Sequence, residues 1–455
     1  MATSLAAVLM AGGLGTRMRS AVPKHFHPIL GRRMVDWIVE AGSAAGADPL
    51  VVVASPLTKD EFAATGVSVA VQEQALGTGD AVRSAREALA GHDGDVLILS
   101  GDTPLLTAEL LRDLVDAHRR AGADATILSA EPPDPRVYGR IVRAADGSVV
   151  KIVEGTDASE EEQKIGEINS SIYVFKSSVL WPALERIEPK NVQGELYLTD
   201  AIEIVVADGG KVAAHVASDS RETDGVNTRA ELASAAAVLR DRINERHMLN
   251  GVTIVDPHTT WIEPTVEIEP DATIEPFTYL RAGTRVAEGA TIGANSVVIA
   301  AHVGRSATIG PFCYLRPGTV LGESSKAGTF VEIKNSRIGD RAKVPHLSYI
   351  GDAEIGEGSN IGAAGITANF PHKPGEPKGR TVIGKDVRTG IHNSFMAPVT
   401  IGDGAWIGAG SVITKDVPAD ALAIARAPGE QGGLCSPSAR RVLSSSSPAS
   451  RRRRP

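Results

Sequence analysis

A six-residue period in the second half of the chain limits the possible folds more than any other feature of the sequence. Aliphatic residues recur at every sixth position from Ile262 to Val298, and the spacing returns at Ile401, Ile407 and Ile413. A helix repeats every 3.6 residues and an ordinary strand every two, so neither explains the pattern. It predicts a triangular parallel β-helix in which each flat side points one aliphatic residue inward. A β-sandwich is disfavoured because its strands would alternate with a period of two.

The first half of the chain follows a different pattern, in which short apolar runs alternate with amphipathic stretches. The stretches at 80–90 and 108–121 have helical spacing, and the apolar runs predict strands. Strands that alternate with helices indicate an α/β domain with a mainly parallel sheet and a ligand site at the carboxyl ends of its strands. The predicted strands are 5–9, 50–53, 67–71, 96–99 and 125–128.

These patterns divide the chain into four predicted parts. The α/β domain covers 1–228, and 229–250, which contains no glycine or proline, is a helical linker. The β-helix covers 251–427, and 428–455 is a low-complexity tail that we expect to be disordered. The arginine run within that tail is either solvated, which is favoured, or contacts an anionic partner.

Composition narrows the class of protein further. The net charge of −8 argues against general binding to nucleic acid or to an anionic membrane. Only two cysteines occur, Cys313 and Cys435, so a disulfide framework or a cysteine metal site is excluded and a reducing cytoplasm is expected. The sequence shows no signal-peptide pattern and no apolar window of transmembrane length.

A glycine-rich loop directly follows the first predicted strand. Gly12, Gly13 and Gly15 let the backbone approach a ligand closely, and Arg17 and Lys24 add positive charge where phosphates would bind. The loop lacks both the Gly-Lys-Ser/Thr ending of a P-loop and the Gly-x-Gly-x-x-Gly dinucleotide fingerprint. It predicts a nucleoside triphosphate site, although a loop of this kind taken alone is equally compatible with a tight turn.

The loop followed by Pro-Lys resembles that of the sugar-nucleotide pyrophosphorylases, and the resemblance continues along the chain. Together with the β-helix, residues 5–426 resemble the bifunctional N-acetylglucosamine-1-phosphate uridylyltransferase / glucosamine-1-phosphate N-acetyltransferase (GlmU) family. The resemblance implies a Rossmann-like nucleotidyltransferase domain of the GT-A type, followed by a left-handed parallel β-helix of hexapeptide repeats. The further segments that carry it are 72–81, 100–104, 138–142, 152–155, 167–170, 195–200 and 225–228.

For the first domain, the resemblance implies transfer of UMP from UTP to N-acetylglucosamine 1-phosphate. Lys24 and Arg17 would be catalytic and contact phosphates, and Gln72 would bind the uracil edge. One or two Mg²⁺ ions would be held by Asp102 and Asn227. The implied nucleotide and sugar-binding residues are Leu9, Met10, Ala11, Gly12, Lys24, Gln72, Gly77, Thr78, Ser100, Gly101, Asp102, Gly139, Glu154, Asn169 and Asn227.

For the β-helix, the resemblance implies acetylation of glucosamine 1-phosphate by acetyl-CoA, with His346 as the general base. The chain departs from the family at Phe370, where a tyrosine is usual, at Ile391, where a serine is usual, in a longer loop at 371–380, and after Arg426. Arg316, Lys334, Tyr349 and Asn360 would bind glucosamine 1-phosphate, and Ala363, Asn369, Phe370, Ala409 and Arg426 would bind acetyl-CoA.

The predicted protein is therefore a cytoplasmic homotrimer that acts on sugar phosphates, UTP and acetyl-CoA and binds neither nucleic acid nor membrane. Acetylation comes first and uridylylation second, and the product, UDP-N-acetylglucosamine, feeds cell-wall polymers. One alternative is a uridylyltransferase whose β-helix only trimerises or regulates. Another is a non-enzymatic sensor or scaffold built on the same domains.

Overall fold

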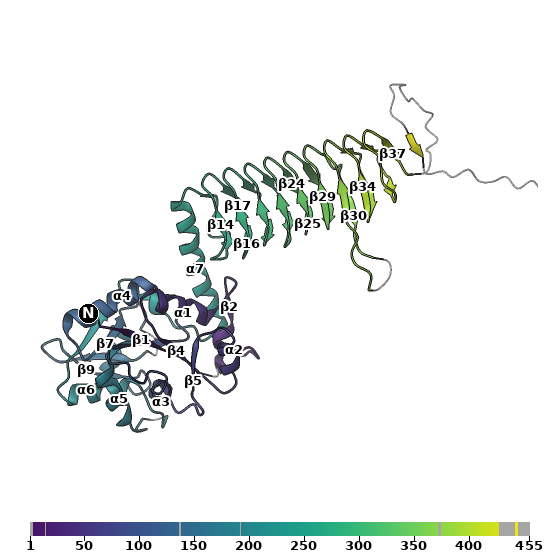
Figure 1. Ribbon diagram of the computed structural model, residues 1–455. Helices are drawn as coiled ribbons and strands as arrows, with labels where there is room; N and C mark the ends of the chain where they lie inside the picture. Colours follow the sequence, from purple (N-terminus) through teal and green to yellow (C-terminus); the bar gives the residue numbers. More distant parts are fainter. Residues whose placement is uncertain are drawn as a thin grey trace, which may run out of the picture. The chain divides into compact units, whose positions relative to one another are not determined.

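A computed structural model describes residues 3–13, 15–135, 138–191, 193–371, 375–426 and 442–444 of the chain. The chain divides into two compact units, Met1–Val238 and Leu239–Pro455. Figure 1 shows a sheet with helices in the first unit and a stack of short strands in the second. Among the described residues, no helix combines the length and apolar character needed to cross a bilayer.

The first unit is built on a nine-stranded sheet whose main path has the order β11-β7-β10-β6-β1-β4-β5. Strand β10 runs antiparallel to β6 and β7, while the other neighbours on this path are parallel. The sequence thus predicted a mainly parallel sheet correctly. The strands are β1 (Leu5–Ala11), β4 (Leu50–Ala54), β5 (Ser68–Val71), β6 (Asp95–Ser100), β7 (Ala125–Ala130), β8 (Arg140–Arg143), β9 (Val149–Val153), β10 (Ile168–Lys176) and β11 (Val212–Val216), with a separate hairpin of β2 (Pro28–Ile29) and β3 (Arg32–Arg33).

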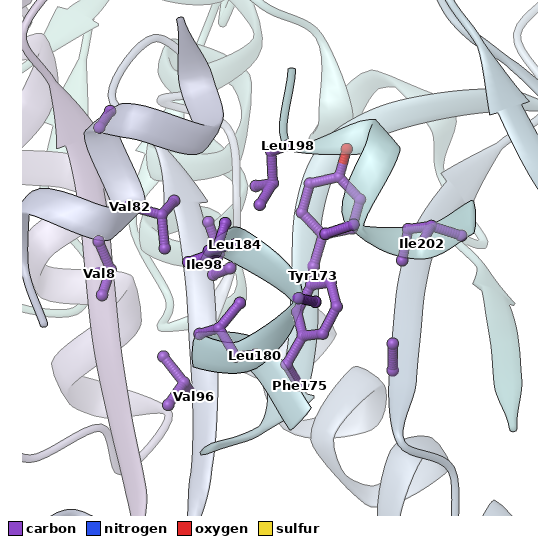
Figure 2. Packing of buried hydrophobic residues seen from close by; sticks show 14 of the residues in the cluster. Val8, Val82, Val96, Ile98, Tyr173, Phe175, Leu180, Leu184, Leu198 and Ile202 are labelled. Carbon is purple, nitrogen blue, oxygen red and sulfur yellow. The ribbon is translucent and has the colours of Figure 1, made fainter. Parts of the chain in front are cut away.

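Helices cover both faces of this sheet because successive residues of its central strands are apolar and point to opposite faces. In β6, Val96 and Ile98 belong to one buried cluster, whereas Leu97 and Leu99 belong to another. Figure 2 shows the first cluster, where Tyr173 and Phe175 of β10 pack near Leu180, Leu184 and Ile202. The helices are α1 (Met34–Ala44), α2 (Lys59–Ala63), α3 (Thr78–Ser84), α4 (Ala108–Ala121), α5 (Ser177–Glu185), α6 (Thr199–Ala207) and α7 (Arg229–Leu249), with 3-10 turns η1 (Thr16–Met18), η2 (Lys24–Phe26), η3 (Glu162–Lys164) and η4 (Ser220–Thr223).

One predicted helix is shorter than its sequence pattern. Helical spacing covers 80–90, but α3 ends at Ser84 and 85–90 continue as turns. The amide of Leu89 is shared between the carbonyls of Ala85 and Arg86, at 3.2 and 3.3 Å, which is typical of a helix end that tightens. The prediction for 108–121 matches α4, which begins at the Thr107 side-chain cap on Leu110 and ends at left-handed Gly122.

The second unit is a parallel β-helix of three sheets, as the six-residue period predicted. From β12 to β29, neighbours within a sheet are three strands apart in the chain, so each of these six coils contributes one strand to each side. Ile262, Leu280, Val298 and Leu315 pair in sequence on one side and are fully buried. Residues six apart therefore lie on successive sides, and residues about eighteen apart lie above one another.

The three sides carry most of the strands of this unit. The first is β12 (Thr253–Ile254), β15 (Thr273–Ile274), β18 (Thr291–Ile292), β21 (Thr308–Ile309), β24 (Lys326–Thr329) and β27 (Lys343–His346). The second is β13 (Trp261–Ile262), β16 (Tyr279–Arg281), β19 (Val297–Ile299), β22 (Tyr314–Leu315), β25 (Glu332–Lys334), β28 (Tyr349–Gly351), β30 (Ile366–Ala368), β33 (Ser394–Met396) and β36 (Val412–Ile413). The third is β14 (Glu267–Ile268), β17 (Arg285–Val286), β20 (His302–Val303), β23 (Val320–Leu321), β26 (Arg337–Ile338), β29 (Ala353–Ile355), β31 (Thr381–Ile383) and β34 (Val399–Ile401).

A further four-stranded sheet comprises β32 (Arg388–Thr389), β35 (Trp406–Ile407), β37 (Leu422–Ile424) and β38 (Val442–Ser444). Single bridges from Lys343 to Asn360 and from Asn360 to Arg388 connect it to the first side. Strand β38 lies within the expected tail and pairs with β37, so these three residues differ from the disorder expected there. The rest of 428–455 lies outside the described residues.

The predicted linker corresponds to α7, and the two halves of this helix belong to different units. Thr228 and Glu231 form a reciprocal cap at its start, within the first unit. Near its end, the Asn244 side chain donates to the carbonyls of Pro257 and Thr260, within the second unit. The boundary between the compact units accordingly falls inside the helix, after Val238.

Candidate active sites

A cleft of about 360 Å³ opens in the first unit where β1, β5 and β6 end. Open α/β sheets bind ligands at the carboxyl ends of their strands, where the strand order reverses around the first strand. The glycine loop, η2, the start of α3 and the segment before α7 complete its walls. Many of the residues that the sequence predicted to bind substrate line this cleft. They are Met10, Gly12, Arg17, Lys24, Gln72, Gly77, Thr78, Ser100, Asp102 and Asn227.

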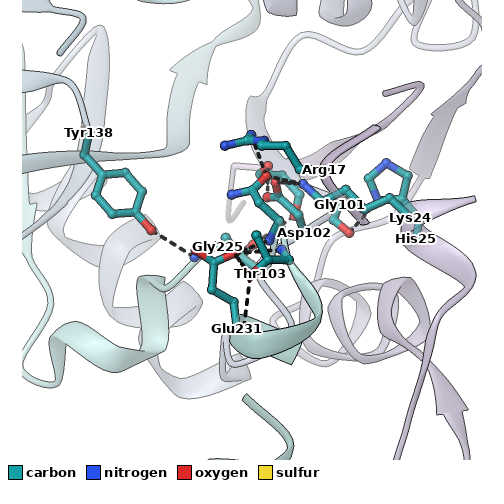
Figure 3. Close-up of polar contacts among 12 residues, drawn as sticks. Arg17, Lys24, His25, Gly101, Asp102, Thr103, Tyr138, Gly225 and Glu231 are labelled. Carbon is teal, nitrogen blue, oxygen red and sulfur yellow. Dashed lines mark hydrogen bonds and ion pairs between the residues drawn. The ribbon is translucent and has the colours of Figure 1, made fainter. Parts of the chain in front are cut away.

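Lys24 is the centre of a polar network in this cleft (Figure 3). Its Nζ donates to Oδ2 of Asp102 at 2.5 Å and to Oδ1 of Asn227 at 2.7 Å. The Arg17 guanidinium donates to the same Asn227 oxygen at 2.8 Å. Lys24 is only 7% exposed, so its charge is little screened by water. Two cations and two oxygen ligands predicted from separate motifs therefore converge on one point.

Local structure places each member of this network. Asp102 follows β6, and Ser100 donates to its second carboxylate oxygen at 2.6 Å. The backbone amide of Asn227 donates to Glu231 at 2.8 Å, so the cap at the start of α7 fixes Asn227. Burial alone would raise the pKa of Asp102, but the charge of Lys24 and the hydrogen bonds from Lys24 and Ser100 outweigh it and lower that pKa. Asp102 is therefore an ionised oxygen donor.

The residues at this point fit a magnesium ion. Asp102 and Asn227 each turn an oxygen toward the same ammonium group, and Mg²⁺ prefers such oxygen donors. Among the described residues, no cluster of three or more His, Cys, Asp or Glu side chains has the arrangement of a metal site. One carboxylate and one amide oxygen match the needs of Mg²⁺, which usually takes one or two protein ligands together with phosphates and water.

The strand before the loop brings only some of its side chains to the cleft. The side chains of Leu9 and Ala11 are buried in the sheet core, and neither residue lines the cleft. Met10, between them, lines the cleft with its side chain. Gly15 has φ of +63°, and a Cβ there would lie 2.3 Å from Cβ of Lys24, so only glycine allows the loop to approach Lys24.

A second pocket of about 260 Å³ adjoins the first and shares Met10, Thr78 and Glu195 with it. Glu154 lines this pocket and accepts a hydrogen bond from Thr199 at 3.2 Å. Burial raises the pKa of the Glu154 carboxyl. A partly buried carboxylate beside hydroxyl groups is suited to bind sugar hydroxyls, as the sequence comparison implied for Glu154.

Gly139 and Asn169 lie beside Glu154 without lining the pocket themselves. A Cβ at Gly139 would be 3.5 Å from both Glu154 Oε2 and Asn169 Cβ. The Asn169 side chain donates to the Tyr173 hydroxyl at 2.8 Å and accepts from the Ser171 amide at 3.1 Å. Gly101, another expected site residue, donates its amide to the Met10 carbonyl at 2.8 Å and so joins β1 to the end of β6.

Several residues of the two pockets were missed by sequence reasoning. Glu195, Tyr197 and Thr199 belong to a segment recognised only as part of the resemblance, with no role given to any of them. His25 lines the cleft, is buried, and its Nδ1 forms a hydrogen bond with the Gly101 carbonyl at 2.8 Å. Its position directly after Lys24 was the one signal available in the sequence.

On the β-helix, three expected sugar-phosphate residues lie on successive coils of the second side. The amide of Arg316 donates to the Ile333 carbonyl at 2.8 Å, and Lys334 pairs with Gly351 at the end of β28. Tyr349 begins β28, and a Cβ at Gly351 would lie 2.4 Å from its hydroxyl, so the ring lies over this glycine. Arg316, Lys334 and Tyr349 are thus neighbours on one face.

His346 and Asn360 occupy other positions in the coil. His346 ends β27 and is exposed at the corner that leads from the first side to the second. Asn360 bridges Lys343 and Arg388, so it belongs to the first side rather than to the face that carries Tyr349. One chain therefore places His346 beside the Arg316–Tyr349 face but does not bring Asn360 onto it.

The amino-acid sequence matches two family models. Residues 7–188 match the MobA-like NTP transferase domain, and residues 380–415 match the bacterial transferase hexapeptide model with six repeats. The Bifunctional protein GlmU of Caldanaerobacter subterraneus subsp. tengcongensis is 47% identical over 440 residues, covering 93% of this chain and 95% of the relative. The chain belongs to the GlmU family. Relatives of the same name from Streptomyces coelicolor and Corynebacterium efficiens are 47% and 45% identical, covering 92% and 93% of this chain and 92% and 91% of theirs.

The acetyl-CoA residues implied by the GlmU family follow one edge of the β-helix. The His392 amide donates to the Ala363 carbonyl, and the Gly410 amide, next to Ala409, donates to the Ile391 carbonyl, both at 2.8 Å. A Cβ at Gly410 would be 3.5 Å from Cδ of Arg426. The coils therefore follow in the order Ala363, Ile391, Ala409 and Arg426. Ile391 is the position where the GlmU family usually has serine.

Asn369 and Phe370 follow β30, and a lysine that sequence reasoning missed lies beside them. Lys378 Nζ is 5.8 Å from the ring centroid of Phe370, which is 76% exposed. Contact with Lys378 lowers the pKa of Lys334. Two ammonium groups this close are suited to share an anion, so Lys378 joins the expected sugar-phosphate face. The longer loop that precedes it was the signal, although His372, Lys373 and Pro374 lie outside the described residues.

Proposed function

We propose that this chain carries out both final steps of UDP-N-acetylglucosamine synthesis. The observation that carries the proposal is the network in which Lys24 and Arg17 meet Asp102 and Asn227 at the glycine loop. The match to whole bifunctional relatives along 93% of the chain supports two activities over the alternative of uridylyl transfer alone. UTP, acetyl-CoA and sugar 1-phosphates are then the small-molecule substrates.

For uridylyl transfer, a phosphate oxygen of N-acetylglucosamine 1-phosphate attacks the α-phosphorus of UTP, and the bond to the bridging oxygen breaks to release pyrophosphate. Such a displacement depends on alignment and charge neutralisation more than on a protein base. Lys24 and Arg17 supply positive charge where the departing pyrophosphate gathers negative charge. Glu154 and its neighbours hold the sugar in the adjoining pocket. Mg²⁺, held by Asp102 and Asn227, would add charge neutralisation when bound.

For acetyl transfer, His346 removes a proton from the amino group of glucosamine 1-phosphate as the nitrogen attacks the thioester carbonyl of acetyl-CoA. The C–S bond breaks, and the CoA thiolate accepts a proton. Imidazole suits the role of base because it titrates near neutrality. Arg316, Lys334 and Lys378 bind the phosphate, and the edge with Ala363, Ala409 and Arg426 holds acetyl-CoA.

The acetyl site is completed in this proposal by a second copy of the chain within a homotrimer. Asn360 and Tyr349 lie on different sides of one β-helix, so both reach one sugar only if the sides come from two copies. Phe312, Phe330 and Leu347, here called the corner ridge, are 49%, 57% and 59% exposed next to His346. Apolar side chains gathered in this way mark a surface suited to self-association. We place the enzyme in the cytoplasm, where its nucleotide and CoA substrates occur.

A coupled assay tests both halves at once. With UTP, Mg²⁺ and glucosamine 1-phosphate, pyrophosphate should form only when acetyl-CoA is added. With N-acetylglucosamine 1-phosphate it should form without acetyl-CoA. Pyrophosphate from the acetylated sugar alone would leave the uridylyltransferase alternative standing. No pyrophosphate in either reaction would favour a sensor or scaffold.

A further inference from the structure

The amide group of Gln72 is held in one orientation by two acceptors. Its Nε2 donates to the Gly77 carbonyl and to Oδ2 of Asp80, both at 3.0 Å. The other oxygen of Asp80 accepts from the Arg83 guanidinium at 2.6 Å. Gln72 is 7% exposed and the Asp80 side chain 12% exposed, so protein rather than water supplies these partners. Neither the resemblance nor the proposed mechanism gives Asp80 a role.

This arrangement fixes which end of the Gln72 amide is available to a ligand. A carboxylate paired with arginine can only accept hydrogen bonds, and so can a carbonyl. Both hydrogens of the Gln72 amide are therefore used by Gly77 and Asp80, which leaves Oε1 as its free polar atom. Oε1 faces Gly12 of the cleft, since a Cβ at Gly12 would lie 3.0 Å from it.

The backbone at Gly77 supports the same orientation. Gly77 has φ of +122° and begins α3, and a Cβ there would lie 2.4 Å from the Leu196 carbonyl oxygen. Only glycine fits this position, so the direction of the Gly77 carbonyl is set by the fold. Asp80 follows in the first turn of α3, where a negative charge is favourable. A charged acceptor and a fixed carbonyl thus act on the same amide.

We propose that Asp80 is a positioning residue that makes the enzyme select UTP over CTP. The inference rests on the proposed function and on the role that the resemblance implies for Gln72, which is to bind the uracil edge. Uracil carries a hydrogen on N3, which Oε1 of Gln72 can accept. Cytosine carries a lone pair on N3, which would face the Oε1 lone pairs with no hydrogen between them. Discrimination of this kind is strong because the wrong base leaves buried polar groups unpaired.

The test is the ratio of kcat/KM for UTP to that for CTP, measured by pyrophosphate release with N-acetylglucosamine 1-phosphate. We expect the unaltered enzyme to favour UTP by at least about a hundredfold. In Asp80→Asn, Arg83 retains the oxygen of the new amide, so its NH₂ group faces Gln72 and favours the reversed Gln72 orientation. The ratio should fall by about tenfold or more, with CTP use rising relative to UTP use.

Two controls separate base selection from helix stability. Glu109→Gln removes a carboxylate from the first turn of α4, outside both pockets, and should leave the ratio unchanged. Asp80→Ala removes the acceptor without offering a donor, so its ratio should fall less than that of Asp80→Asn. If Asp80 only supports α3, both nucleotides lose activity in the same proportion and the ratio stays within about twofold, which overturns the inference.

The same measurements distinguish this inference from the proposed function. Failure of the unaltered enzyme to use UTP would reject the proposed function itself. Efficient use of UTP by the unaltered enzyme, with no change of ratio in Asp80→Asn, would reject only the role of Asp80. An unaltered enzyme that uses CTP as well as UTP would also reject it, because the fixed Gln72 orientation would then have no effect on base choice.

Discussion

The nucleotide cleft and the expected sugar-phosphate face of the β-helix both offer lysine and asparagine side chains. One chain brings the lysine and the asparagine together in the cleft but not on the β-helix. In the cleft, Lys24 is buried and donates hydrogen bonds to Asp102 and Asn227 of the same chain. On the β-helix, Lys334 is half-buried on an open face, its neighbour is another cation, and Asn360 lies on a different side. One chain therefore suffices to assemble the cleft, whereas in our proposal the flat β-helix side depends on a second copy to enclose its ligand.

Substitution of Lys24 should have the largest effect and should separate the two sites. Lys24→Met keeps the length of the side chain but removes the charge at the centre of the network. We expect uridylyl transfer to fall by about 10³-fold, as for loss of a preorganised group that stabilises transition-state charge. Acetyl transfer, followed by CoA release, should not change. Lys190→Met, an exposed lysine in the same unit, is the control. A parallel loss of both activities would mean that the sites are not independent.

Removal of the proposed general base should give the reverse pattern. His346→Gln should reduce acetyl transfer by about 10²- to 10⁴-fold, the usual range for positioned acid–base catalysis. Uridylyl transfer to N-acetylglucosamine 1-phosphate should remain at its original rate. His302→Gln, on the third side of the β-helix, serves as the matched histidine control. Acetyl transfer that survives in His346→Gln would mean that another residue is the base and that this substitution does not separate the two sites.

A change at the corner ridge tests whether the second site needs a second copy. Phe330→Asp puts a charge among exposed apolar side chains, since its ring stacks on Phe312 with centroids 5.3 Å apart. We expect the mass by light scattering to fall from that of a trimer to that of a monomer. Acetyl transfer should then fall between about tenfold and a hundredfold, because contacts made by the partner are lost.

Uridylyl transfer by the same variant should be unchanged, because the described walls of that cleft come from one chain. Val255→Asp is the control, since Val255 is 59% exposed, close to the 57% of Phe330, but lies at the start of the β-helix. A monomeric Phe330→Asp variant with full acetyl transfer would show that one β-helix is sufficient. The contrast between an enclosed and a shared site would then be wrong.

The parts of the fold that were predictable are those encoded by local repetition. Ile262 and its equivalents had to point inward because each side of a coil buries one large aliphatic side chain, beside a small residue such as Thr260. The parts that were not predictable depend on tertiary contacts. Helical spacing continued beyond Ser84, but the chain tightens into turns there. The antiparallel strand β10 carries an apolar pattern like that of its parallel neighbours, so nothing in its residues revealed its direction.

The candidate sites show the same division. Lys24, Arg17 and Asp102 lie in recognisable motifs and were found, and the structure brings them together. Leu9 lies in the same motif, but β1 is buried on both faces, so its side chain belongs to the core. Lys378 was missed because its contact with Lys334 joins segments that the sequence alone does not bring together. Asp80 lies in the segment 72–81, but its bond to the Gln72 amide depends on how the chain turns into α3.

The smallest expected effect concerns stability rather than activity. It is a dependence of the unfolding of the β-helix unit on pH. His247, near the end of α7, is 5% exposed, and burial together with the charge of Arg246 lowers its pKa to about 4. In the unfolded chain the group has its ordinary pKa of about 6.5. Between these two pKa values His247 is protonated in the unfolded state and neutral in the folded state. The free energy of unfolding therefore decreases as pH falls from about 6.5 toward about 4. At pH 5 the loss is about 2 kcal/mol.

Replacement of His247 by leucine removes the titrating group and should reduce the dependence of stability on pH. In calorimetry, the transition of the β-helix unit should melt a few degrees higher at pH 5 in His247→Leu than in the unaltered protein, and the difference should shrink at pH 7.5. Both transfer activities at pH 7.5 should be unchanged, since His247 lines neither pocket of the first unit and is far along the coil order from His346. His258→Leu is the control, because the His258 side chain is 80% exposed and so lacks the burial that acts on His247. An equal shift at both pH values would mean that leucine acts through packing alone, because a protonation effect must vanish where neither state binds the proton.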